Sequence, residues 1–173
     1  MKKIILTYGL IAGAIVGTML AISIPLYNNG VITIENGQWV GYSIMIIALS
    51  LIFFAVKNYR DQHLGGVISF GRAFQVGILV TLVAAIVYAI TWEICYHTIA
   101  KNFMQLMADS YKKQLEMDFS DAAIIQQKTN EMNQMMEMYK NPAVRFGMTI
   151  LEILPVGLAL SILSAVILKK KTV

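Results

Sequence analysis

The chain has 173 residues, of which 57% are hydrophobic and only 14% charged, whereas a soluble domain averages about 25% charged residues. The hydrophobic residues collect in long blocks, which excludes an ordinary soluble domain and indicates a membrane protein. The single cysteine, Cys95, excludes an intrachain disulfide framework and a cysteine-based zinc site. The net charge is +4, and the charged residues fall between the hydrophobic blocks. They therefore bear on membrane topology rather than on nucleic-acid binding.

Four apolar blocks are each long enough to cross about 30 Å of hydrocarbon, which takes roughly 20 helical residues. They run approximately over residues 4–27, 40–56, 73–96 and 143–168. The sequence therefore predicts an all-α integral membrane four-helix bundle that forms a single domain over residues 1–173. The first block follows two lysines, as a signal peptide would. It is longer than the roughly 7–15 residues of a signal-peptide core, so we expect an uncleaved helix.

Basic residues near the ends of these spans define the predicted topology. They are Lys2, Lys3, Lys57, Arg60, Arg72, Lys169, Lys170 and Lys171. The segment between the first and second spans, NNGVITIENGQW (residues 28–39), contains no lysine or arginine. Because lysine and arginine collect in cytoplasmic loops, we expect both termini and the 57–72 loop in the cytoplasm.

Small residues repeat at four-residue intervals in the first and fourth spans. Those of the first span are Gly9, Gly13 and Gly17, and those of the fourth are Gly157, Ser161 and Ala165. This spacing puts each set on one helix face, where small side chains allow another helix to approach closely in lipid. We expect the first span to pack within the chain against the second, third or fourth span, and the small residues of the fourth span make it a candidate neighbour. Homodimerisation through the glycine face is the alternative.

The segment KNYRDQHLGGVISFGRAF (residues 57–74) connects the second and third spans. Its Arg60 and Arg72 either set topology and anchor the chain at the interface, or hold the phosphate of a lipid headgroup. A second span that ends in FFAVKNYRD, followed by GGVISFGRAF at the start of the third, resembles an uncharacterised family of small bacterial proteins. That family is catalogued only as a domain of unknown function, and the resemblance covers nearly the whole chain.

The resemblance implies a four-helix protein of the bacterial inner (cytoplasmic) membrane, and it brings no catalytic residue. It also fits an accessory role in lipid-linked (polyprenyl-phosphate) glycan assembly, in which Arg60 and Arg72 would be the phosphate contacts.

Residues 98–141 form the one long polar segment, and their apolar side chains recur with helical spacing. We therefore predict an extracytoplasmic amphipathic helical hairpin between the third and fourth spans. Its methionine-rich stretch MNQMMEM (residues 132–138) offers thioethers that suit Cu(I). Methionine is also a flexible apolar filler, so we expect packing against the hairpin itself or against a partner.

The segment TWEICYH (residues 91–97) ends the third span with a carboxylate at membrane depth. Glu93 and Glu152 lie about 8 and 13 Å inside the outer ends of their spans, at about 1.5 Å per residue. His97 follows Glu93 by four residues, and Arg145 precedes Glu152 by two helical turns. Ionisable residues in membranes usually face the bundle interior and pair with one another.

Three interpretations of these four residues remain open. They form a structural polar cluster between the third and fourth spans, they line a cavity for a ligand or protons, or Glu93, His97 and Glu152 hold a metal. The sequence contains no Gly-rich phosphate loop, no H-E-x-x-H and no G-x-S-x-G motif. We therefore expect a non-catalytic protein without a cofactor or bound metal.

The first functional hypothesis is that the protein acts by homo-oligomerisation or as an accessory subunit of an envelope complex. The alternative is a ligand-binding or transport-like protein that uses an outer-leaflet cavity built from Glu93, His97 and Glu152. In either case the expected partners are the lipid bilayer and another membrane protein or a second copy of the chain, and no nucleic acid.

Overall fold

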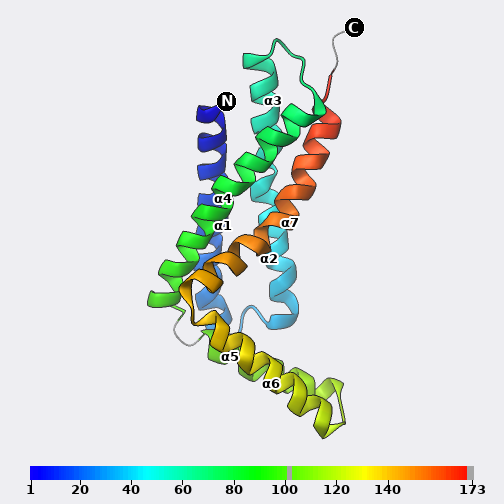
Figure 1. The fold of residues 1–173 in the computed structure, drawn as a ribbon. Coiled ribbons are helices and arrows are strands. Elements are labelled where there is room, and N and C mark those ends of the chain that lie inside the picture. Colours follow the sequence, from blue (N-terminus) through cyan, green and yellow to red (C-terminus); the bar gives the residue numbers. More distant parts are fainter. Residues whose placement is uncertain (101–102, 171–173) are drawn as a thin grey trace.

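The structure, a computed structural model, describes residues 1–100 and 103–170, and it is helical throughout these segments apart from short connections (Figure 1). The helices are α1 (Lys2–Asn28), α2 (Ile34–Leu49), α3 (Leu51–His63), α4 (Phe70–Thr98), α5 (Phe103–Asp118), α6 (Ala122–Tyr139) and α7 (Pro142–Leu168). The predicted all-α membrane bundle is confirmed, because four stretches are long and apolar enough to cross a membrane. The protein is thus a multi-pass membrane protein.

The second span is longer than the predicted 40–56 and covers Asn36–His63, through α2 and α3. A capping box begins it early. The Thr33 amide donates to the Asn36 Oδ1 at 2.9 Å, and the Asn36 amide donates to the Thr33 Oγ1 at 3.4 Å. The helix stops just before Gly65, whose φ of +61° is a conformation that favours glycine. Local capping and turn residues, rather than hydrophobicity, therefore set both ends.

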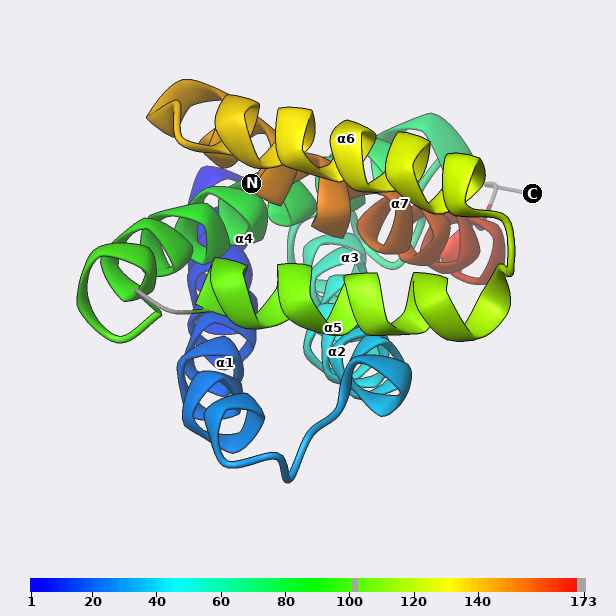
Figure 2. The same ribbon diagram turned by 90° about the horizontal axis from the view of Figure 1, so that it is seen from below.

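The bundle has two distinct ends (Figure 1). The terminal end carries the N-terminus, the connection from α3 to α4 and the last described residues, where Ile68 and Lys170 exchange two backbone hydrogen bonds of 3.2 and 3.0 Å. Lys171 lies outside the described residues. The hairpin end carries the connection from α1 to α2 and the α5–α6 hairpin. Seen from that end, α5 and α6 run side by side across the bundle (Figure 2).

Of the three spans expected as possible neighbours, the small-residue face of α1 packs against the third, α4, and not against α7. A Cβ added at Gly13 would lie 2.6 Å from the Val87 Cβ and 2.9 Å from the Ala84 carbonyl oxygen. The small residues of α7 face α4 as well, because a Cβ at Gly77 would lie 2.8 Å from the Ser161 Oγ. Helix α4 is therefore the central element, with α1 and α7 on different sides, and the glycine face of α1 is covered within the chain.

Candidate functional site

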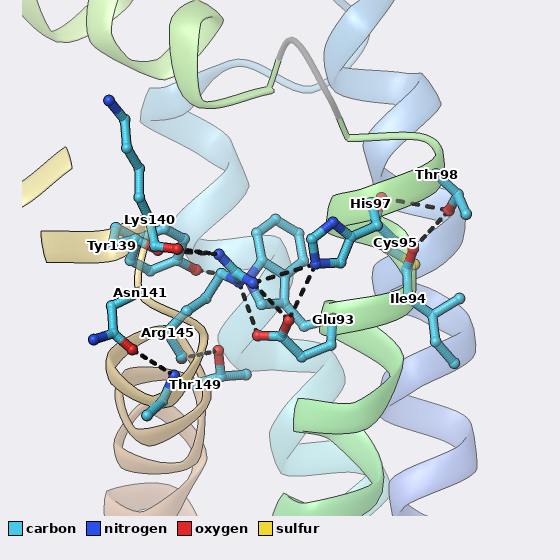
Figure 3. A network of polar contacts seen from close by, with 12 residues as sticks. Glu93, Ile94, Cys95, His97, Thr98, Tyr139, Lys140, Asn141, Arg145 and Thr149 are labelled. Carbon is cyan, nitrogen blue, oxygen red and sulfur yellow. Dashed lines mark hydrogen bonds and ion pairs between the residues drawn. The ribbon is translucent and has the colours of Figure 1, made fainter. Parts of the chain in front are cut away.

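Glu93 of α4 and Arg145 of α7 form a bidentate ion pair at the hairpin end (Figure 3). The Arg145 Nε donates to the Glu93 Oε1 at 2.8 Å, and its Nη2 donates to the Oε2 at 2.6 Å. Only 1% of the Arg145 surface is exposed. Planar guanidinium and carboxylate groups match in this parallel geometry, which makes it stronger and more directional than a single contact.

The remaining donor of Arg145 reaches the end of the hairpin. Its Nη1 donates to the Tyr139 carbonyl oxygen at 3.1 Å, and the guanidinium carbon lies 3.8 Å from the centre of the Tyr96 ring. His97, whose ring is largely exposed, has its Nε2 3.7 Å from the Glu93 Oε2. Arg145 thus joins α4, α7 and the end of α6, and this contact group of Glu93, His97, Tyr96 and Arg145 is called the arginine clasp here.

Glu152 does not belong to the arginine clasp, although the sequence grouped it with Glu93, His97 and Arg145. Its Oε2 instead accepts a hydrogen bond from the Tyr88 hydroxyl at 3.3 Å. Tyr88 lies five residues before Glu93 on α4, which is about 7.5 Å deeper along the helix. The two carboxylates therefore lie at different depths, and the metal set that was one of the three interpretations, Glu93, His97 and Glu152, is not assembled among the described residues.

Glu152 lines a cavity at the hairpin end with a volume of about 470 Å³. Side chains of α1, α2, α4 and α7 form its walls, and Phe103 and Met107 of α5 lie over it together with Tyr139 of α6. Its polar groups include Thr149 and the hydroxyls of Tyr27 and Tyr88. Within the described residues, no three His, Cys, Asp or Glu side chains come together as a set of metal ligands.

An aromatic contact group fastens the hairpin above this cavity. The Trp92 Nε1 donates to the Tyr139 hydroxyl at 2.6 Å, and the Trp92 ring lies edge-on to Phe103 at 5.6 Å between centroids. Phe103 in turn contacts Tyr27 of α1, also edge-on at 5.6 Å. Burial raises the pKa of the Tyr139 phenol, so its hydroxyl stays neutral as an acceptor for the indole.

The hydroxyl of Tyr139 is expected to hold the hairpin closed. Tyr139→Phe keeps the ring but leaves the buried Trp92 indole donor without its acceptor, which costs about 1–3 kcal/mol. Local opening of α6 becomes easier, so its amides should exchange hydrogen at least about fivefold faster. Hydrogen exchange measured by mass spectrometry tests this, with Tyr111→Phe on the exposed side of α5 as the control. Equal exchange in both variants would contradict a fastening role for this hydroxyl.

The two arginines proposed as phosphate contacts lie at the terminal end with separate partners. Arg60 donates from Nε to the Asp61 Oδ1 at 2.7 Å and from Nη1 to the Leu168 carbonyl oxygen at 3.5 Å. Arg72 donates to the Gln75 Oε1 at 3.3 Å. Among the described residues they share no hydrogen-bond partner.

A family model described as a protein of unknown function (DUF4199) matches residues 7–170. No curated protein matches the chain, and no solved structure does.

Proposed function

The chain belongs to this family of proteins of unknown function, and we propose that it is a non-catalytic membrane protein that binds a small amphiphilic molecule in the cavity beneath the α5–α6 hairpin. The observation that carries the proposal is the position of Glu152 in the wall of this cavity. Glu152 is a carboxylate about 15 Å beyond the start of α7, exposed to a cavity instead of being buried in an ion pair. Charged groups at such depth are costly, and they usually mark a ligand or ion pathway.

The dimensions and lining of the cavity support this function. Small-molecule sites typically enclose about 300–1,000 Å³ and are mostly apolar, with a few placed polar groups. The cavity of about 470 Å³ has this character, with methionines and aliphatic side chains along α1 and α2 and a few polar groups on α4 and α7. The arginine clasp and the Trp92–Tyr139 hydrogen bond hold the hairpin across its outer side.

The orientation of the chain follows from its basic residues. We place the terminal end in the cytoplasm of a bacterial cell and the hairpin end outside, because lysine and arginine collect near the terminal end. The cavity then lies in the outer half of the inner membrane. A ligand reaches it from the outer leaflet or from the extracytoplasmic solution.

A cavity-filling substitution tests this function. Gly41 lines the cavity, and a Cβ added there meets nothing within 4 Å, so Gly41→Phe should fill the cavity without displacing the fold. Gly147 on α7 also has open space and does not line the cavity, which makes Gly147→Phe the matched control. Native mass spectrometry after extraction in mild detergent should detect a small molecule with the wild type and with Gly147→Phe, and none with Gly41→Phe.

Two outcomes of this experiment would contradict the proposal. One is a wild-type protein that carries no small molecule beyond lipid and detergent. The other is Gly41→Phe protein that retains as much ligand as the wild type.

Association with a second protein is the other candidate function, and the exposed apolar side chains of the hairpin favour it. Met117, Met135 and Met138 are 77%, 54% and 56% exposed. The glycine face of α1 does not support self-association, since α4 already covers it. Mass measurement in mild detergent separates the candidates, because this second function requires a dimer or a co-purifying protein, whereas ligand binding is compatible with a monomer.

A further inference from the structure

We propose that the cavity selects small organic cations, amines or quaternary ammonium compounds with an apolar body, and that Glu152 is their counter-ion. The inference rests on the proposed function and names the chemical class of its ligand. Three features carry it: the charge of the cavity, the aromatic rings that line it, and the depth of Glu152.

The cavity has one acidic side chain and no basic side chain among its described lining residues. Among the described residues that line it, Glu152 is the one side chain with a formal charge. The nearest arginine along α7, Arg145, is committed to both oxygens of Glu93 and does not line the cavity. The arginine clasp therefore takes up the local cation, and Glu152 is left with the Tyr88 hydroxyl as its hydrogen-bond partner. A cationic ligand supplies the missing charge, whereas an anionic ligand is repelled.

Aromatic side chains line the same cavity as Glu152. Tyr88 and Trp92 lie one turn apart on α4, and Tyr27 and Tyr139 line the cavity from α1 and α6. The face of an aromatic ring attracts a cation, most strongly for tryptophan, and quaternary ammonium groups are bound in this way. The thioethers of Met19 and Met45 add a soft, adaptable wall for an apolar body.

The side chains that line the cavity do not suit a metal ion as the bound cation. Calcium takes six to eight oxygen ligands, and magnesium needs near-octahedral oxygen coordination. The described lining offers a single carboxylate, and its other side-chain oxygens are the Gln38 amide and the hydroxyls of serine, threonine and tyrosine, which carry no charge to offset a divalent ion. An organic cation needs no such coordination shell, because one counter-ion and several ring faces are enough.

The depth of Glu152 disfavours a phospholipid headgroup. The carboxylate lies about 15 Å along α7 from its start, whereas headgroups stay at the membrane surface. A small molecule such as an aryl or alkyl ammonium compound can place its charge at this depth and its apolar body among Met19, Leu20 and Met45.

Fluorescence of Trp92 provides a direct binding signal. The chain has two tryptophans, and Trp39 is 76% exposed and does not line the cavity. In a Trp39→Phe background, Trp92 is the sole reporter. The probes are benzyltrimethylammonium and neopentylbenzene, which have the same shape but differ in a positive nitrogen and a neutral carbon. The full chain in detergent is titrated with each probe.

We expect saturable binding of benzyltrimethylammonium that is at least about tenfold tighter than that of neopentylbenzene. Glu152→Gln should remove this preference, and Glu131→Gln on the exposed hairpin should preserve it. Gly41→Phe should block both probes, which checks that the signal comes from the cavity independently of any effect of Glu152→Gln on folding.

The outcomes separate the two proposals. Equal binding of both probes that Gly41→Phe blocks and Glu152→Gln leaves unchanged overturns the choice of a cation and supports the proposed function. Responses that Gly41→Phe does not alter place both probes outside the cavity and overturn this inference together with its premise.

Discussion

Arg145→Met is expected to lower the free energy of unfolding by about 3 kcal/mol, because removal of one partner of a buried ion pair leaves the other charge uncompensated. Glu93 would lose both of its short hydrogen bonds at membrane depth, and the Tyr139 carbonyl oxygen would lose its donor. For a chain of this length the fall in Tm should be about 6–12 °C. Thermal unfolding in detergent, followed by circular dichroism, measures it.

Two further variants isolate the charge effect. Arg72→Met removes an exposed arginine at the other end of α4 and should change stability by less than about 0.5 kcal/mol. The double variant Arg145→Met with Glu93→Leu should recover part of the loss, since apolar replacement of both partners leaves no unpaired charge. If Arg145→Met and Arg72→Met have the same Tm, the arginine clasp does not hold α4 and α7 together.

Gly157→Ala is expected to destabilise the protein by about 1–3 kcal/mol, the usual cost of overpacking a tight interface. The added Cβ would overlap the Thr81 side chain, which is fully buried between α7 and α4. Gly147→Ala adds the same methyl group to the same helix in open space and should be neutral or slightly stabilising. Denaturation of both variants in one detergent gives the comparison, and equal stability would show that the two helices can move apart without cost.

The spans and their order could be predicted from the sequence because hydrophobic length alone determines which segments cross a membrane. Which span packs against α1 could not be predicted from the sequence. The spacing of Gly9, Gly13 and Gly17 identifies a helix face but not its neighbour. Helix α4 offers matching surfaces on both of its sides, through Ala84 and Val87 toward α1 and through Gly77 toward α7, and a sequence pattern in α1 and α7 does not reveal this.

The arginine clasp and the cavity differ in how far the sequence could predict them. Helical spacing puts Glu93 and His97 on one face, and the structure brings Arg145 against that face. Glu152 lies ten residues inside the start of α7, level with Tyr88 ten residues inside the end of α4, so it pairs with Tyr88 and not with the shallower Glu93. The cavity itself depends on four helices and the hairpin. The one sequence feature that indicated the cavity was the one-turn spacing of Tyr88 and Trp92. Taken alone, Trp92 is equally typical of an aromatic anchor at the membrane interface.

Crystallographic location of a bound cation tests the central claim most directly. The probe is 4-bromobenzyltrimethylammonium, whose bromine scatters anomalously, soaked into crystals of the full chain and of Glu152→Gln. We predict a bromine peak inside the cavity, with the ammonium group between Glu152 and the rings of Tyr88 and Trp92, and no such peak in Glu152→Gln. An empty cavity in the wild type, or bromine only on the lipid-facing surface, would contradict the claim.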